Sequence, residues 1–506
     1  MFKKTPLAIL TFFLLFQIGK SQISYKNRLE FESKNGYDNE RILEFGENGF
    51  IIASKSYNIN DNKREWKYEK FDVNLNSVKS KSVFLNKKLF SDESYESKSE
   101  THRFFRDRKG NFTLVSVNAK NLKVTKASGV LPKKTYISDM AVIGDYAFFK
   151  AISKKEPFLF SVNWKNGDKK LIPLIIDGVK MKKVSVKNFQ VSEENDEIYV
   201  YIKVPKSKKE SDLHVMRLNN IGGKKDQFNL TANIDKNIVE ITASKVKNDK
   251  YVYTGTYSSK SGGTSQGLFF CTAKKGKVEN IEFYNFLDLK NFLSFLPEKK
   301  QEKIKNKQKR KANKGKELSI NYSISPHDII ETEDGYLFLG EAYYPTYRTE
   351  TYTTTTYSNG QAVTVTRTRT VFDGYQYTHA TLAKFNKQGK LIWDQTFEMW
   401  PSFKPFFVKR FISISEKNKN SIKLVFSDRN TINTKSFYFD GRIKKDSKSD
   451  EISTGREGDN IKYTFSNLDY WYDSYFLAYG NQKIKNKEAK GKKKRKVFFI
   501  SKIQYQ

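Results

Sequence analysis

The sequence predicts an all-β protein, a β-propeller of seven or eight four-stranded blades, and two recurring patterns carry this prediction. A turn followed by an apolar strand recurs in eight segments, and most copies are followed by a strand that ends in an Asn or Asp turn. Self-similar antiparallel units of this kind form propellers, because each blade buries its faces against its neighbours and ring closure removes long exposed edges. The alternative is a run of β-meanders that forms two sandwiches, since periodicity alone does not show closure.

The first half of the repeat is a tight turn that leads into a continuous apolar run. Such a run fits a strand that is buried on both faces. In the clearest copy, Asp334-Gly335 predicts a two-residue hairpin turn of type I′, and Tyr336–Leu339 predicts the strand. The other copies begin at Asn48, Gly110, Gly144, Asn195, Asn248, Asn420 and Tyr472.

The second half of the repeat is a strand that ends in Asn or Asp before another turn. Lys384–Gly389 aligns with Lys70–Leu75 and Arg217–Gly222, and looser copies follow elsewhere in the chain. The last expected strand, Val497–Gln504, either completes the final unit or pairs with the segment Ile23–Phe31.

These repeats resemble uncharacterised exported bacterial proteins built from β-propeller-type repeats. The resemblance rests on the Asp-Gly turn before an apolar strand and on the later Asn/Asp-x-x-Gly turn, and it covers most of the chain. It implies the propeller fold. Since the shared motifs are structural turns, it transfers no functional residues.

Residues 1–21 have the pattern of a secretory signal peptide. Lys3 and Lys4 precede the apolar run Pro6–Ile18, and Gly19-Lys20-Ser21 provides small residues at −3 and −1 of a cleavage site. We therefore expect an exported protein, periplasmic or extracellular, with association with the outer membrane as a further option. Residues 22–506 form the expected propeller-like domain. No later apolar run is long enough to span a bilayer, so we expect no transmembrane segment in the mature chain.

The net charge of the chain bears on its binding partners, and its cysteine content bears on how the fold is stabilised. Removing residues 1–21 takes away three lysines and lowers the formal net charge from +36 to +33. A charge of this size affects solubility and partner choice and says nothing about the fold. Cys271 is the single cysteine, so no intramolecular disulfide can form and the core alone must hold the fold.

The first insertion in the repeat pattern is 284–316. Asn285–Leu296 has apolar residues close to the spacing of one helical face, and Pro297 interrupts it. Lys299–Lys316 then holds ten Lys or Arg residues and one Glu. Such a run is commonly a solvated helix end or loop. The functional hypothesis is a clamp for an anionic polymer or surface, reinforced by a second basic run at Lys483–Lys496. The candidate contacts are Lys299, Lys300, Lys309, Arg310 and Lys311.

The second insertion, 345–376, contains the strongest hairpin signal. An Asn-Gly loop between Ser358 and Gln361 fixes the register of two long strands. Eight threonines then share one face, because side chains alternate along a strand. Threonine is a common exposed strand residue, which explains the pattern without a function. The functional hypothesis is a regular polar face that docks on a polysaccharide or a partner strand. The facing pairs are Thr349 with Thr370, Thr351 with Thr368, Thr353 with Thr366 and Thr355 with Thr364.

The sequence shows no recognisable catalytic constellation, and we expect no catalytic residue, resident metal or cofactor. The four histidines lack metal-type spacing, and neither a G-x-S-x-G nor a P-loop motif occurs. His327 and His379 are expected at strand ends of one unit, near Glu341, so a divalent metal between them is a minor hypothesis. Tyr470-Trp471-Tyr472 fits either a sugar-stacking platform or core packing, the commoner role.

The sequence favours an exported envelope protein that binds or scaffolds a protein or polysaccharide partner through its rim insertions. Propellers include both enzymes and binding proteins, so the fold does not decide this. The second hypothesis is a hydrolase of polysaccharide or peptide with carboxylates gathered at the central channel. An acidic pocket there would favour it, and a channel lined with Lys, Tyr and Phe would count against it. The third is a binder of anionic polymer or lipid headgroups. We expect no specific nucleic-acid binding.

Overall fold

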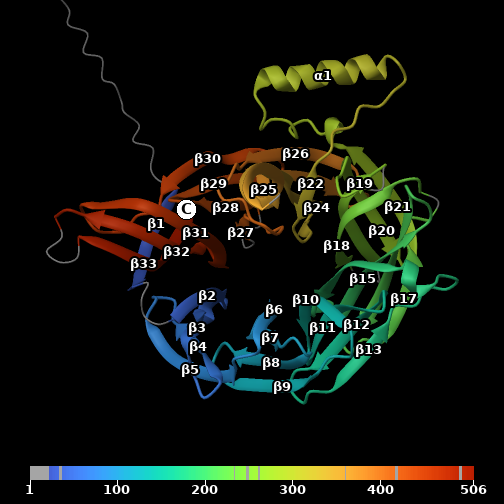
Figure 1. Cartoon of the computed structure of the whole chain (residues 1–506). Helices are drawn as coiled ribbons and strands as arrows, with labels where there is room; N and C mark the ends of the chain where they lie inside the picture. The colour runs from blue at the N-terminus through green and yellow to red at the C-terminus, as the bar shows by residue number, and fades with distance from the viewer. Residues whose placement is uncertain are drawn as a thin grey trace, which may run out of the picture.

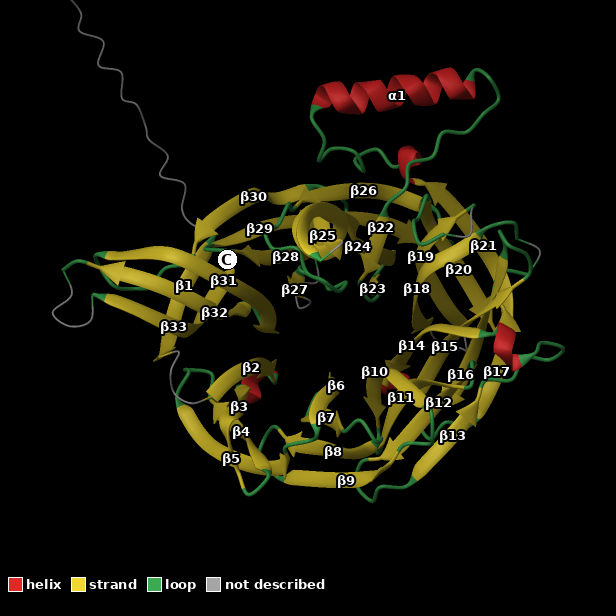
Figure 2. Cartoon of the chain, viewed as in Figure 1, coloured by secondary structure: helices red, strands yellow, loops and turns green. Residues whose placement is uncertain are grey.

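The protein forms a ring of antiparallel sheets around a central axis (Figures 1 and 2). The computed structural model describes residues 22–32, 37–232, 234–246, 250–259, 262–358, 360–415, 420–488 and 493–505. Within these residues seven sheets have four strands and one has five. The predicted all-β propeller is therefore confirmed, with eight blades, and the sandwich alternative is wrong. The predicted signal peptide, residues 1–21, lies outside the described residues.

Each of the first seven blades uses consecutive strands, from the inner edge of the ring outward (Figure 1). Blade 1 holds β2 (Tyr37–Glu44), β3 (Phe50–Asn60), β4 (Lys63–Phe71) and β5 (Ser77–Asn86); blade 2 holds β6 (Phe90–Glu96), β7 (Glu100–Arg106), β8 (Asn111–Asn118) and β9 (Val124–Val130). Blade 3 holds β10 (Thr135–Ile143), β11 (Tyr146–Ser153), β12 (Glu156–Asn163) and β13 (Lys169–Pro173); blade 4 holds β14 (Ser185–Ser192), β15 (Glu197–Pro205), β16 (Ser211–Asn219) and β17 (Lys224–Asn229).

The remaining blades carry the insertions and the closure of the ring. Blade 5 holds β18 (Asn237–Val246), β19 (Lys250–Ser258), β20 (Gly267–Lys274) and β21 (Lys277–Asn285); blade 6 holds β22 (Ser323–Pro326), β23 (Ile330–Thr332), β24 (Gly335–Ser358), β25 (Gln361–Asn386) and β26 (Leu391–Glu398). Blade 7 holds β27 (Ser413–Ser415), β28 (Ser421–Asp428), β29 (Thr431–Tyr438) and β30 (Ile443–Glu451); blade 8 holds β31 (Asp459–Tyr472), β32 (Tyr475–Asn486), β33 (Lys494–Tyr505) and β1 (Ile23–Glu32). The helical elements are η1 (Gly46–Asn48), η2 (Met181–Lys183), η3 (Glu193–Asn195), η4 (Phe286–Asp288) and α1 (Glu298–Ala312).

The first strand closes the ring by completing the last blade. β1 pairs antiparallel with β33, from Ile23 opposite Tyr505 to Glu32 opposite Val497. β33 also pairs with β32, so both roles expected of the last strand occur together. Eight clusters of buried apolar side chains each join two neighbouring blades, including blades 8 and 1. Burial of this apolar surface between blades is the main force that holds the ring.

The recurring Asn/Asp turn adds hydrogen bonds to a side chain to the backbone hydrogen bonds that close the turn. Asn386 Oδ1 accepts from the N–H groups of Gln388, at 3.0 Å, and Lys390, at 2.9 Å. Gly389 has φ +91°, and a Cβ atom there would lie 2.4 Å from the Phe270 ring of blade 5. Gly389 therefore serves both the turn and the close contact between blades, whereas Leu75 adopts φ +68° at the equivalent position of blade 1. Asp72, Asp107 and Asn219 accept from turn N–H groups in the same way.

The prediction of a type I′ turn at Asp334-Gly335 is wrong, because the turn lies one residue earlier in the structure. Thr332 pairs with Gly335, so the loop residues are Glu333 and Asp334, and neither has a positive φ. The buried Lys384 Nζ donates to Asp334 Oδ1 at 2.6 Å. Asp334 thus takes part in a tertiary contact, and the Asp-Gly dipeptide alone does not predict the turn that is observed here.

The helix predicted at Asn285–Leu296 is also wrong. Phe286, Phe292 and Phe295 are buried between blades 5 and 6, and only the short η4 is helical in this segment. The carboxylate of Asp394 on β26 accepts from the N–H groups of Lys290 and Asn291 at 2.8 and 2.6 Å. Tertiary hydrogen bonds thus take the place of helical ones. The α-helix is instead α1, inside the basic run, outside the ring (Figure 1).

The long hairpin has the predicted register. Ser358 pairs with Gln361, and each of the four predicted threonine pairs is present. Asn359 of the loop lies outside the described residues. Figure 1 shows this hairpin nearly end-on, beside the inner strands of blade 6. None of the helices in the described ranges is long and apolar enough to cross a membrane.

Candidate functional site

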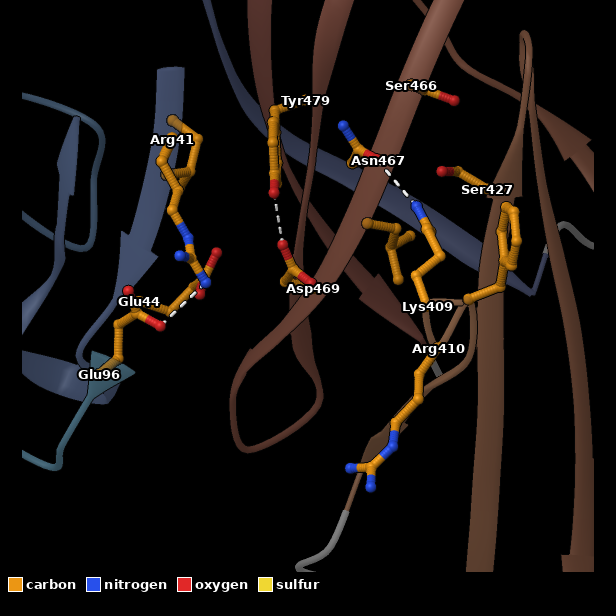
Figure 3. A pocket seen from close by; sticks show the side chains of 13 residues that line it. Arg41, Glu44, Glu96, Lys409, Arg410, Ser427, Ser466, Asn467, Asp469 and Tyr479 are labelled. Carbon is orange, nitrogen blue, oxygen red and sulfur yellow. Dashed lines mark hydrogen bonds and ion pairs between the residues drawn. The ribbon is translucent and has the colours of Figure 1, made fainter. Parts of the chain in front are cut away.

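A cavity of about 320 Å³ lies at the inner edge of blades 8, 1 and 2 (Figure 3). Its lining comes from strands of four blades, including Ser427 of β28 in blade 7, and from the segment 399–412, which connects blade 6 to blade 7. Its wall combines acidic, basic, hydroxyl and aromatic groups from segments far apart in the sequence. The polar and aromatic lining residues are Arg41, Glu44, Glu96, Lys409, Arg410, Phe411, Ser427, Ser466, Asn467, Asp469 and Tyr479.

Three carboxylates face this cavity, and two of them keep an oxygen without a partner. Arg41 donates to Glu96 Oε2 at 2.9 Å, and the Tyr479 hydroxyl donates to Asp469 Oδ2 at 2.6 Å. The Oε1 atoms of Glu44 and Glu96 are buried and have no hydrogen-bond partner among the described residues. These two buried oxygens therefore lack the hydrogen bonds that would stabilise a charged carboxylate.

Burial and neighbouring charges shift the protonation of these acids. Burial raises the pKa of Glu44, and the nearby charge of Asp469 raises it further. Burial also raises the pKa of Glu96, while Arg41 opposes that shift. Burial and then Asp469 raise the pKa of Tyr479. Groups with shifted pKa values in a cavity are typical of functional sites, although structural ion pairs produce them as well.

The segment 399–412 supplies the basic side of the cavity. Lys409 Nζ donates to Asn467 Oδ1 at 3.3 Å. Burial lowers the pKa of Lys409, while Asp469 and Glu341 oppose the shift. Arg410 points away from the carboxylates (Figure 3) and lies 3.7 Å from Asp328.

A buried carboxylate holds this segment in place. Glu341 of β24 is fully buried and accepts from Phe411 N–H and Ile412 N–H, each at 2.9 Å. Its Oε1 also lies 2.8 Å from His327 Nε2. A buried carboxylate is tolerated only where such donors replace water. Glu341 therefore fixes the backbone beside Lys409 and Arg410.

The hypothesised metal site at His327 and His379 is wrong. Glu341 pairs with Ala380 and the next residue, Ala342, pairs with His379, so Glu341 and His379 project from opposite faces of the sheet. His379 stacks on Phe295 with ring centroids 3.9 Å apart, and burial lowers the pKa of His379 to about 3. Across the described residues no group of three or more His, Cys, Asp or Glu side chains is arranged to hold a metal.

The outer hairpin, residues 348–371, is called the arm here. All eight threonines of its predicted face are exposed: Thr349, Thr351, Thr353, Thr355, Thr364, Thr366, Thr368 and Thr370. We expected the arm to lean on the propeller, a partner or another copy. In the structure every arm residue whose exposure is described is exposed or half-buried, so the threonine face is available to a partner.

Exposed aromatic residues surround the base of the arm, and they were not predicted from the sequence. Phe372 contacts Tyr347 and Phe406, both at 5.9 Å between ring centroids. Phe406 and Phe407 are each 69% exposed, and Tyr347 is 63% exposed. Lys404 Nζ holds this part of the segment 399–412 through Asp373, at 3.1 Å. The signal was the run Trp400 to Val408, which is apolar yet broken by two prolines, a pattern that fits neither helix nor core strand.

The predicted basic contacts lie on α1. Lys299, Lys300, Lys309 and Arg310 are exposed, and Lys311 is half-buried. The second basic run belongs to β32 and β33 of blade 8, apart from α1 along the perimeter of the ring (Figure 1), and its residues 489–492 lie outside the described residues. The two runs therefore do not form one surface.

The central residue of the aromatic triplet 470–472 is a core residue. Trp471 is buried between blades 8 and 1 and donates to the Gly49 carbonyl at 3.2 Å. The core interpretation is confirmed for this residue, and the sugar-platform hypothesis is wrong for it.

No protein-family model matches the sequence, and no curated protein matches it. Solved structures with a similar fold include polysaccharide lyase Uly1, with 9% identity, coverage of 95% of this chain and 100% of that chain, and a TM-score of 0.40. The β-propeller domain of the Trilobed protease from Pyrococcus furiosus has 9% identity, coverage of 79% and 93%, and a TM-score of 0.34. The WD40 domain of SCAP from fission yeast has 8% identity, coverage of 96% and 98%, and a TM-score of 0.40.

Matches this distant transfer no function and no site residue to this chain. The propeller part of the resemblance proposed from the repeats is confirmed by the ring of blades. The exported and bacterial character of the protein stays a prediction.

Proposed function

We propose that this protein is an exported binding protein of the bacterial envelope that holds a partner protein through the arm and its aromatic base. The observation that carries the proposal is the exposure of all eight threonines of the arm next to the exposed Phe406 and Phe407. Contiguous exposed apolar side chains commonly mark interaction sites. Large aromatic side chains also contribute a large share of the energy in protein interfaces.

The free edges of the arm favour a protein over a polysaccharide as the partner. Between residues 348 and 371, β24 and β25 pair only with each other in the described part of the chain. Both outer edges thus present backbone N–H and C=O groups that a partner strand can bind. A two-stranded ribbon has little stability alone, so an added strand would also stabilise the arm.

The test is a variant that removes the arm and keeps the blade. Tyr347 pairs with Phe372, so replacing residues 348–371 with Asn-Gly gives a two-residue hairpin loop in the native register. In-cell cross-linking and mass spectrometry first identify proteins linked repeatedly to the wild type. Direct binding of a purified candidate is then compared between the wild type and the truncated variant.

We expect the truncation to weaken this binding by at least about tenfold, a loss of about 1.4 kcal/mol. The matched control is Leu171→Ala on the outer strand β13, a side chain that is also exposed and apolar. Unchanged affinity in the truncated variant would refute the proposal. If no protein partner is found and the truncated variant loses binding to a polysaccharide, the arm is still a contact element, but the proposal of a protein partner is refuted.

The cavity gives specific support to a second candidate, a hydrolase. Glu44 and Glu96 are carboxylates with raised pKa values in one cavity, which suits a general acid. Lys409, Tyr479 and Phe411 line the same space, which counts against it. A panel of polysaccharides and peptides decides the question. Hydrolysis by the wild type that is lost in both Glu44→Gln and Glu96→Gln would favour the hydrolase, and no hydrolysis of any substrate would remove it.

A further inference from the structure

The helix α1 is held outside the ring and has little contact with it (Figure 1). The segment before it is anchored by Phe286, Phe292 and Phe295 between blades 5 and 6. Gln301 Nε2 donates to the Leu296 carbonyl at 2.7 Å, and Ile304 packs against the same apolar cluster. The ring therefore fixes where α1 stands and leaves most of its surface open.

The exposure pattern along α1 defines which side faces the protein. The half-buried residues are Gln301, Ile304, Gln308 and Lys311, which share one side because their spacing is three, four and three. All other residues of the helix are exposed. The single strongly apolar side chain of α1 is thus turned toward the ring.

A basic stripe runs along the exposed surface of the helix. At 3.6 residues per turn, Lys299, Lys303, Lys307 and Arg310 lie within an arc of about 80°. The stripe runs almost the whole helix, whose 15 residues span about 22 Å. It therefore presents a line of positive charge.

The charges on this helix are not neutralised within the protein. α1 carries eight Lys or Arg residues and two Glu residues. No ion pair joins any of these eight to an acidic group in the described ranges. Lys303 lies four residues from both Lys299 and Lys307, and like charges at this spacing destabilise a helix. A polyanion would remove this repulsion.

We propose that α1 is a docking element for a linear polyanion, whose carboxylate, sulfate or phosphate groups contact the stripe of Lys299, Lys303, Lys307 and Arg310. This surface is separate from the arm and does not depend on the proposed function. A linear ligand is favoured over a membrane, because an interfacial helix needs an apolar face toward the lipid and Ile304 faces the ring.

The experiment measures binding of heparin to the full-length protein at several salt concentrations. The stripe variant combines Lys299→Gln, Lys303→Gln, Lys307→Gln and Arg310→Gln. The matched control removes the same net charge elsewhere, through exposed lysines of two ring loops. It combines Lys87→Gln, Lys88→Gln, Lys208→Gln and Lys209→Gln.

The stripe variant is expected to bind heparin at least about tenfold more weakly at about 0.1 M salt, with a smaller slope of log affinity against log salt. Four lost cations at about 0.7 each reduce the slope by about 3. The control should keep the wild-type slope within about 1. Amide exchange along α1 should slow when heparin binds the wild type, since neutralised charges stabilise the helix.

Equal losses in the two variants would overturn the proposal, because net charge alone would then explain the binding. Binding to vesicles with anionic lipids but not to heparin would also overturn it, in favour of a membrane. Polyuronate and single-stranded DNA, measured in parallel, distinguish a carboxylate from a phosphate polymer. A stripe variant that melts at the wild-type temperature shows that the loss is not one of folding.

Discussion

The inner and outer halves of the β24–β25 pair share the same two strands and lie in opposite environments. In the inner half Leu337, Leu339, Leu382 and Ala383 have no exposed surface. In the outer half, the arm, the threonine face is exposed on both strands. The backbone pairing continues through both halves, with two register shifts between them. Pairing alone therefore does not decide stability; the burial of side chains against neighbouring blades does.

The largest expected effect compares two glutamates of β24, one in each half. Glu341→Ala leaves the N–H groups of Phe411 and Ile412 without an acceptor, and should lower the free energy of unfolding by about 3–5 kcal/mol. Glu350→Ala removes only the exposed ion pairs with Arg348 and Arg369, and should cost about 0.5 kcal/mol or less. Chemical denaturation measures both. Equal costs would mean that the inner half is not what stabilises the pair.

A second effect follows from His379 in the inner half. Its folded pKa of about 3 lies below the value of about 6.5 in the unfolded chain, so the unfolded state binds the proton more readily. The stability due to neutral His379 is complete above pH 6.5 and falls by about 1.4 kcal/mol per pH unit between pH 6.5 and 3.

The test of this effect is the slope of unfolding free energy against pH. His379→Phe should flatten it between pH 6.5 and 4, whatever its effect at neutral pH. His214→Gln, at a half-buried position, should change it less. An unchanged slope in His379→Phe would contradict the assignment.

The smallest expected effect concerns the arm. Replacing residues 348–371 with Asn-Gly should shift the melting temperature by no more than about 2 °C, because surface changes away from buried contacts cost about 0.5 kcal/mol or less. Differential scanning calorimetry measures the shift. A fall larger than that produced by Glu341→Ala would show that the arm supports the ring and would remove the contrast between the two halves.

The parts of the fold that depend on local turn chemistry could be predicted from the sequence. Asn-Gly after Ser358 fixed the register of the arm, and the Asn386–Gly389 turn marked the end of a strand. The turn prediction at Asp334-Gly335 was wrong because an Asp-Gly dipeptide is compatible with more than one loop conformation. The helix prediction for Asn285–Leu296 was wrong because its apolar residues pack between two blades. Their spacing in the sequence resembles that of an amphipathic helix, although the cause is this packing.

The cavity could not be predicted for a different reason. Glu44, Glu96 and Asp469 lie on strands of three blades, and Lys409 lies on a connecting segment. Each residue alone reads as an ordinary exposed charge. Only closure of the ring brings these residues together, and no residue spacing in the sequence predicts which of them meet. The acceptor role of Glu341 is hidden in the same way, since its donors lie 70 and 71 residues later.

The pairing of β1 with β33 has a consequence for how this chain reaches its final form. The two strands are joined by contacts between residues more than 460 positions apart, such as Glu32 with Val497. Contacts at such separation form slowly, because a long loop must close before they contribute. A chain synthesised from its N-terminus must keep β1 unpaired until the last strand is available. Until then the open edge of β1 presents unpaired backbone N–H and C=O groups to which another strand can bind.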